Sequence, residues 1–165
     1  LASRRVGGDT GLVGRSRTLR AASGWLELGL PGDALCELSR LPTGERDTPA
    51  ALRLRLAAQM EQETWNAAAD TARLLCLKRP REVAAFLHAA YCLHETGDTL
   101  AARDWLLRGP RELLDEPLFH YNMACYQAVL GEACQARHHL TRELELDPAL
   151  ETAASVDADL DSLRA

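Results

Sequence analysis

The chain has 165 residues and a net charge of −5, and its composition is 47% hydrophobic and 26% charged. This length suffices for one compact domain or a short array of repeats, and the composition excludes a chain that is disordered throughout. An acidic chain without an apolar run of about 18 residues is also expected to have neither a nucleic-acid partner nor a membrane-inserted segment.

Residues 1–14 are predicted to form a flexible basic segment. Residues 1–20 contain five arginines, whereas Asp9 is their only acidic residue. Three interpretations stay open for this segment: a basic arm that contacts an acidic partner, an organelle-targeting sequence, or a flexible leader.

From residue 15 onward the sequence repeats with a period of 34 residues. Alanines recur at this interval at Ala34, Ala68, Ala102 and Ala136. Glycines keep the same interval at Gly29, Gly97 and Gly131, with Glu63 in the remaining place. Because no insertion interrupts the series, the chain divides into four repeats. The repeats are residues 15–48, 49–82, 83–116 and 117–150.

Each repeat is predicted to be a hairpin of two α-helices. In the last repeat Pro117 suits the first turn of a helix, and Gly131 ends the apolar series that follows. Asp98 suits the start of a second helix, and Asp147-Pro148 suits the end of one. Two helices of about 12 to 14 residues cannot bury their apolar stripes alone, so neighbouring hairpins are expected to stack.

The fourth repeat carries the clearest family pattern, in residues 121–126 (YNMACY), Leu130-Gly131, Ala136-Arg137 and residues 144–148 (LELDP). With these residues the chain resembles the tetratricopeptide repeat (TPR) family. The resemblance implies an all-α, right-handed superhelical solenoid of stacked antiparallel helical hairpins. Residues 151–165 are expected to close it as a capping helix with an acidic cap or tail at residues 157–161.

The third repeat departs from this pattern at Gly109-Pro110. This dipeptide is predicted to end the second helix early and to leave residues 110–116 as an irregular connection. The connection contains Leu113 and Leu114, an apolar pair that is suited to self-association.

In this family the first helix of each hairpin lines a concave groove, so the resemblance implies a binding site for a partner peptide or helix. The tyrosines would act as rigid anchors and the arginines would receive a carboxylate, unless the tyrosines simply pack between repeats. The expected groove residues are Arg20, Arg53, Met60, Leu87, His88, Tyr91, His94, Tyr121, Asn122 and Cys125.

Three glutamates also keep the period of 34 residues, namely Glu27, Glu61 and Glu95. They are expected to form a ladder of carboxylates along one edge of the groove. The alternative is three solvated glutamates at equivalent surface positions.

The sequence contains no nucleophile elbow, P-loop, dinucleotide-binding glycine motif or zinc-protease motif, so a non-enzymatic protein without a cofactor is predicted. His88 and Cys92 are four residues apart and could share a helical face. Such residues on repeat helices more often pack or face solvent, and no metal site is predicted. His138-His139 is expected to be a solvated pair.

The leading functional hypothesis is a non-catalytic module that binds a peptide or helix of another protein. The alternatives are a self-assembling scaffold, which would make the chain a homo-oligomer, and a secretion-type chaperone for a protein client. Five cysteines without a C-x-x-C spacing predict reduced thiols and a cytoplasmic protein. Eighteen arginines beside one lysine, Lys78, indicate a GC-rich and bacterial genome.

Overall fold

A computed structural model describes the backbone of residues 9–164 and the side chains of residues 17–149 and 154–164. This part of the chain is helical and contains no β-strand, which confirms the predicted all-α class. The described helices are all too short or too polar to cross a membrane. The chain divides into two compact units, Leu1–Leu74 and Leu75–Ala165, which we call unit 1 and unit 2.

Unit 1 consists of α1 (Asp9–Glu27), α2 (Pro31–Ser39), the 3-10 helix η1 (Thr43–Glu45), α3 (Pro49–Glu61) and most of α4 (Trp65–Lys78). A proline in the first turn starts both α2 and α3, because this position needs no backbone N–H donor. Helix α1 packs against α2, and α3 packs against both. Small side chains form most of the core between them, which lets the helices approach closely. The core residues are Ala22, Ala34, Leu38, Leu41, Ala51 and Ala58.

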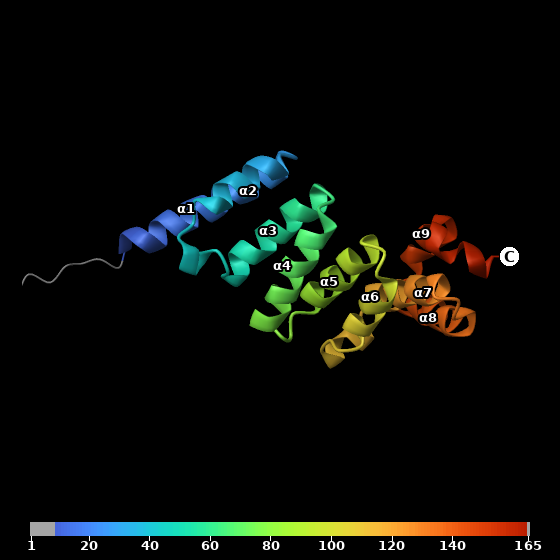
Figure 1. Ribbon diagram of the computed structural model, residues 1–165. Helices are drawn as coiled ribbons and strands as arrows, with labels where there is room; N and C mark the ends of the chain where they lie inside the picture. Colours follow the sequence, from blue (N-terminus) through green and yellow to red (C-terminus); the bar gives the residue numbers. More distant parts are fainter. Residues whose placement is uncertain (1–8, 165) are drawn as a thin grey trace, which may run out of the picture. The chain divides into compact units, whose positions relative to one another are not determined.

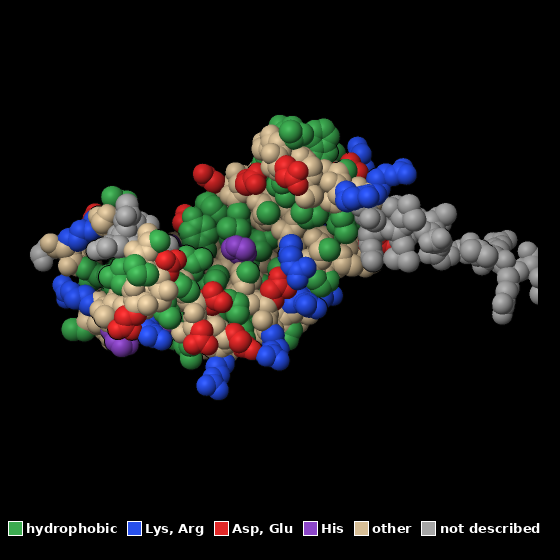
Figure 2. Space-filling view, turned by 180° about the vertical axis from the view of Figure 1, so that it is seen from behind, with side chains coloured by type: hydrophobic (Ala, Val, Ile, Leu, Met, Phe, Trp, Pro, Cys, Tyr) green, Lys and Arg blue, Asp and Glu red, His purple; other side chains and the backbone are tan. Residues whose placement is uncertain are grey.

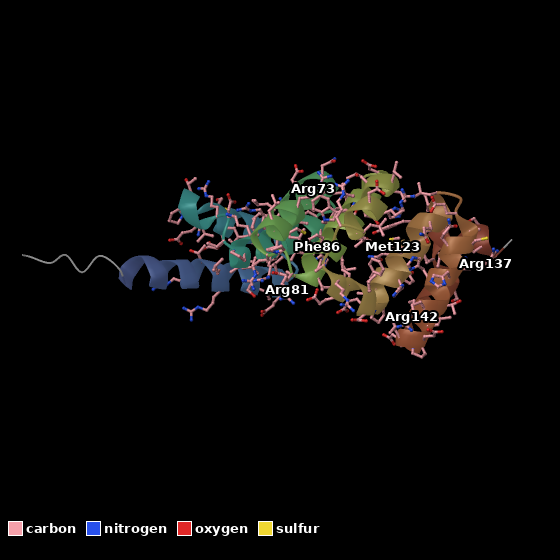
Figure 3. All side chains as sticks on the ribbon, turned by 90° about the horizontal axis from the view of Figure 1, so that it is seen from below. Arg73, Arg81, Phe86, Met123, Arg137 and Arg142 are labelled. Atoms are coloured by element: carbon pink, nitrogen blue, oxygen red, sulfur yellow. The ribbon has the colours of Figure 1, made fainter. Side chains whose placement is uncertain are left out.

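Unit 2 consists of the end of α4, α5 (Val83–Glu95), α6 (Thr99–Leu106), η2 (Arg111–Asp115), α7 (Pro117–Val129), α8 (Ala133–Leu146), η3 (Pro148–Leu150), α9 (Glu151–Val156) and η4 (Ala158–Leu163). Helices α5 and α6 form one hairpin, α7 and α8 form the next, and α7 contacts both helices of the first (Figure 1). Phe86 and Met123 lie among the helices, whereas Arg137 and Arg142 lie at the periphery of the unit (Figure 3).

The helix boundaries keep the interval of the repeated alanines. The second helices of the four hairpins begin at Pro31, Trp65, Thr99 and Ala133. The first helices end at Glu27, Glu61, Glu95 and Val129. The four alanines of the sequence repeat are all fully buried. A periodic sequence has therefore produced a periodic series of helices, with a small buried residue at the same place in each second helix.

A left-handed residue lies between the two helices of every repeat. The φ angles are 69° at Gly29, 54° at Glu63, 86° at Gly97 and 81° at Gly131. After α3, the N–H of Glu63 bonds to the Met60 carbonyl and the N–H of Thr64 bonds to the Gln59 carbonyl, at 3.0 and 2.9 Å. These bonds satisfy carbonyls at the end of the helix. Glu63 is thus the one non-glycine residue with positive φ in the described chain.

The connection between α6 and α7 agrees with its prediction in one respect and corrects it in another. Helix α6 ends at Leu106, so the predicted early end is confirmed. Leu113 is buried, however, and only Leu114 is exposed, so the expected apolar surface pair is not present. Gly109 permits this packing, because a Cβ atom there would lie 2.1 Å from Cδ1 of Leu113.

The two terminal segments differ in part from their predicted structure. Residues 1–8 of the predicted flexible segment lie outside the described residues, whereas residues 9–14, which were also predicted to be flexible, belong to α1. At the other end, the closing helix is α9, and residues 158–163 form η4, which contacts α7 and α8. The acidic segment is therefore a packed cap over the described range.

Candidate functional site

Helices α5 and α7 present a common face in unit 2. On α5, Leu87, Tyr91 and His94 follow one another at helical spacing; on α7, Tyr121 and Cys125 do the same. The two helices contact each other. We call this surface the α5–α7 face. The two helices also carry the seven predicted groove residues of unit 2, whose joint role as a groove stays a prediction: Leu87, His88, Tyr91, His94, Tyr121, Asn122 and Cys125.

One end of the α5–α7 face is covered by residues 157–163 of the same chain, which we call the clasp. The hydroxyl of Tyr121 donates a hydrogen bond to Oδ2 of Asp157. The thiol of Cys125 donates to the same oxygen at 3.7 Å. Oδ1 of Asp157 accepts a bond from the backbone N–H of Asp159 at 2.9 Å. The Asp157 carboxylate therefore has three donors, two of which belong to α7.

The second carboxylate of the clasp bonds to α5. Nε2 of His94 lies 2.8 Å from Oδ2 of Asp159. On the other side of the ring, Nδ1 of His94 lies 2.9 Å from the Thr99 hydroxyl. Since the carboxylate accepts, Nε2 donates to Asp159, and in a neutral His94 ring Nδ1 then accepts from the Thr99 hydroxyl. The His94 ring also packs against Tyr126, with ring centroids 4.9 Å apart. Both ring nitrogens and one ring face of His94 are thus engaged.

Apolar and backbone contacts complete the clasp. Leu160 is 2% exposed and is the buried apolar residue of this segment. The Arg137 guanidinium of α8 donates to the Leu163 carbonyl at 3.3 Å, and the Ser162 hydroxyl donates to the Ala128 carbonyl at 3.4 Å. The clasp therefore contacts three helices through two carboxylates, one leucine, one hydroxyl donor and one backbone acceptor.

The electrostatics of the clasp keep its donors protonated. Burial raises the pKa of the Cys125 thiol, and the negative charges of Asp157 and Asp159 raise it further. Burial and the hydrogen bond to Asp157 also raise the pKa of Tyr121. At neutral pH both groups hold their protons, so each can donate to a carboxylate and neither serves as a nucleophile.

Three residues at the clasp also carry the ligand types of a metal site. One ligand atom each of Cys125, Asp157 and Asp159 lies within 4.8 Å of the others, the one such group in the described chain. Both carboxylates already accept hydrogen bonds from protein groups, and the thiol is held protonated. We therefore assign this group to the attachment of the clasp. His88 and Cys92 do not share an environment, because His88 is exposed and Cys92 is buried.

The rest of the α5–α7 face is more accessible. Tyr91 is 37% exposed, Leu118 is 49% exposed, and His88 is also exposed. Leu87 and Asn122 are half-buried. We call His88, Tyr91 and Leu118 the exposed part of the face. Exposed hydrophobic side chains lie among charged ones on the surface (Figure 2).

The predicted groove residues of unit 1 lie on α1 and α3, which contact each other. Arg20 and Arg53 are exposed, and Met60 is half-buried. The three glutamates of the expected ladder are all exposed, Glu27 and Glu61 in unit 1 and Glu95 in unit 2. Glu27 accepts a hydrogen bond from the Ser23 hydroxyl at 3.4 Å. Their role as a groove edge stays a prediction.

A hollow of about 340 Å³ lies in unit 1 beside the connection from α2 to α3. The Arg46 guanidinium donates to the carbonyls of Leu41 and Ser39 at 2.8 and 2.7 Å. Arg55 donates to the Arg46 carbonyl at 2.6 Å and pairs with Asp47 at 3.5 Å. Because these donors hold the connection itself, we assign the two arginines to structure.

The expectation of a solvated His138-His139 pair was wrong for His139. His138 is exposed, but His139 is half-buried, and its Nδ1 lies 2.9 Å from Nδ1 of His120. Nε2 of His120 donates to the Leu114 carbonyl at 3.1 Å, so Nδ1 of a neutral His120 accepts from His139. Burial lowers the pKa of both rings, that of His139 to about 4.

Sequence reasoning missed the partners of the clasp. It placed His94, Tyr121 and Cys125 on a groove surface and treated the acidic residues 157–161 separately. One signal was available, because Asp157 and Asp159 are separated by one residue and the apolar Leu160 directly follows them. Their pairing with α5 and α7 depends on chain folding over 65 and 36 residues. No protein-family model and no curated protein matches the chain.

Proposed function

We propose that the chain is a non-catalytic protein-binding module of the tetratricopeptide repeat type, with its hairpins stacked as a solenoid. The support is the common interval of the helix boundaries and buried alanines, together with a left-handed residue in every hairpin turn. Stacked hairpins of this kind expose the first helices as a continuous binding surface.

The observation that carries the binding proposal is the exposed part of the α5–α7 face. Tyr91 and Leu118 expose apolar surface on two helices that contact each other. Tyrosine offers a large, rigid contact area with a polar end, which suits a binding anchor. A peptide or helix of another protein could bury both side chains.

The experiment compares partner capture by two double variants. Tyr91→Ala/Leu118→Ala removes the two exposed side chains of the face. Leu77→Ala/Leu107→Ala removes two leucines that are 78% and 61% exposed at other places in unit 2. Each tagged protein is used to isolate partners from the native lysate, followed by mass spectrometry.

We expect the face variant to lose a partner that wild type and the control variant both retain. Circular dichroism must show unchanged helicity in all three proteins. Equal recovery by the face variant, or equal loss in both variants, would reject the assignment of binding to the α5–α7 face.

Two further features support the proposal. All five cysteines are free, which suits a reducing compartment such as the cytoplasm. The ionisable groups around Asp157 are held as hydrogen-bond donors, and this arrangement suits recognition better than catalysis.

Self-assembly is the second candidate. Leu28 and Leu30 are exposed in the turn between α1 and α2 of unit 1, and Leu114 is exposed in unit 2. Light scattering over a range of concentrations tests it, because a monomer at every concentration would exclude it.

A further inference from the structure

The clasp shows which chemistry its binding site accepts. The acceptor groups are the carboxylates of Asp157 and Asp159, and the apolar group is Leu160. In sequence these residues form the pattern Asp-x-Asp-Leu. The receiving groups are the hydroxyl of Tyr121, the thiol of Cys125 and the imidazole of His94. All three can donate a hydrogen bond, and they belong to the rigid helices α5 and α7.

This set of donors disfavours an apolar occupant. Cys125 is buried, and Tyr121 and His94 are partly buried. Covering such donors without an acceptor leaves their hydrogen bonds unmade, which is unfavourable in a buried site. A segment that replaces the clasp must therefore carry hydrogen-bond acceptors at the same two places, as the carboxylates of Asp157 and Asp159 do.

The clasp has less packing than the helices that it covers. Within it, Leu160 is buried, whereas Ala158, Asp161 and Ser162 are exposed. It follows α9, a helix of only six residues, whose last residue Val156 is exposed. Segments with few buried contacts open locally more readily than a packed hairpin. Release of the clasp would leave α5 to α8 with their own contacts.

We propose that the clasp is an intramolecular ligand, and that a partner protein with an acidic Asp-x-Asp-Leu segment binds this site by displacing it. The inference rests on the proposed function, because it uses the α5–α7 face. It adds the chemistry of the partner and a regulatory step. The tethered clasp competes at a high effective concentration, so it selects for partners that bind tightly or that also contact the exposed part of the face.

The test uses the full chain and a labelled peptide, ASVDADLDSLR, which copies residues 154–164. A release variant, Asp157→Asn/Leu160→Ala, weakens the attachment of the clasp. Fluorescence anisotropy then measures peptide binding to wild type and to the release variant. We expect at least tenfold tighter binding to the release variant, because its site is more often vacant.

Two controls define the site. A peptide with asparagine in place of both site-contacting aspartates should bind at least tenfold more weakly to the release variant. Adding Tyr121→Phe and His94→Gln to the release variant should weaken its binding of the acidic peptide by a similar factor. If neither the asparagine peptide nor the Tyr121→Phe and His94→Gln substitutions change the affinity, the proposal is overturned. It is also overturned if the release variant stays helical but does not bind the peptide at millimolar concentration.

Hydrogen exchange on wild type provides a second measurement if the release variant unfolds. The N–H groups of Leu160 and Arg164 bond to backbone carbonyls within the segment. Excess acidic peptide should accelerate exchange in residues 158–164 and leave the amides of α7 unchanged. No acceleration would overturn the proposal. A dimer of the release variant in light scattering would also overturn it, because the occupant would then be the clasp of a second copy.

None of these measurements uses Tyr91 or Leu118. If the acidic peptide does not bind but the capture experiment gives its expected result, only the proposal that a partner displaces the clasp is rejected. If Tyr91→Ala/Leu118→Ala captures the same partners as wild type while the acidic peptide still binds as expected, only the proposed function of the exposed part of the face is rejected.

Discussion

The hydroxyl of Tyr121 on α7 donates a hydrogen bond to the carboxylate of Asp157, a residue 36 positions further along the chain. This bond fixes the end of the clasp on the first helix of the last hairpin. The prediction from it concerns Tyr121→Phe, which removes the hydroxyl and keeps the ring. A bond to a charged acceptor contributes about 1.5 to 3 kcal/mol, and we expect a loss near the lower limit because the site is only partly buried.

Chemical denaturation should measure this loss, with Tyr91→Phe as the matched control. Tyr91 is more exposed than Tyr121, and the tyrosine that bonds to Asp157 of the clasp is Tyr121. Because Tyr91 is more exposed to water, we expect its substitution to lower the free energy of unfolding by less than Tyr121→Phe does. Equal effects of the two substitutions would contradict the special role of the Tyr121 hydroxyl.

The end of α6 allows a test of core packing with two adjacent leucines. Leu106 is 2% exposed, and its neighbour Leu107 is 61% exposed. Leu106→Ala should lower the free energy of unfolding by about 2 to 5 kcal/mol, since it removes buried methyl groups and leaves a cavity. Leu107→Ala should change it by less than about 0.5 kcal/mol. If urea denaturation shows a larger loss for Leu107→Ala than for Leu106→Ala, then Leu106 is not the residue of α6 that faces the core.

Backbone conformation predicts that introducing a glycine at one turn stabilises the chain and that removing a glycine from an equivalent turn destabilises it. Glu63 has a φ of 54°, so Glu63→Gly should stabilise the chain by about 0.5 to 1 kcal/mol. Gly97 has a φ of 86°, and a Cβ there would meet no atom within 4 Å. Gly97→Ala should therefore destabilise by about 1 kcal/mol through backbone strain alone. Thermal denaturation at fixed pH would compare both variants with wild type, and the same sign for both would contradict this account.

The pair of His120 and His139 predicts loss of stability in acid. Burial, followed by the nearby His120 and His138, lowers the pKa of His139 from 6.5 to about 4. Below pH 6.5 the unfolded chain binds a proton that the folded ring does not, so the free energy of unfolding should fall as pH decreases from 6.5 to about 4. Above pH 6.5 this contribution is fully present.

Urea midpoints at pH 7 and pH 4.5 would measure the effect. His139→Gln should reduce the pH dependence, because it removes the ring whose pKa is lowered to about 4 and leaves only His120 with a pKa lowered by burial. His138→Gln is the control, since His138 is exposed and should leave most of the dependence in place. The same slope in wild type and His139→Gln would exclude His139 as its source.

Sequence reasoning succeeded where the signal is local. Alanine at Ala34 and its equivalents marks a position that the helix itself turns inward, and Gly97 with Asp98 marks the end of one helix and the start of the next. Glu63 was found in the same way, because it occupies the place of a glycine in the period. Such features depend on residues a few positions apart, so the chain order alone reveals them.

The candidate site was only half predictable. The resemblance to the repeat family placed His94, Tyr121 and Cys125 on the inner helices, but their partners lie in residues 157–163, which contact α7. Likewise, the spacing of His138 and His139 gives no sign that His120 from another helix bonds to one of them.

The sequence by itself determined the helices, their repeated interval and the backbone conformation of their turns, because each is set by side chains within one or two turns of helix. The tertiary structure alone decided that an acidic segment covers part of the α5–α7 face. Contact between residues 36 to 65 positions apart depends on how whole helices pack, and hydrogen-bond donors such as Tyr121 accept many alternative partners until that packing selects one.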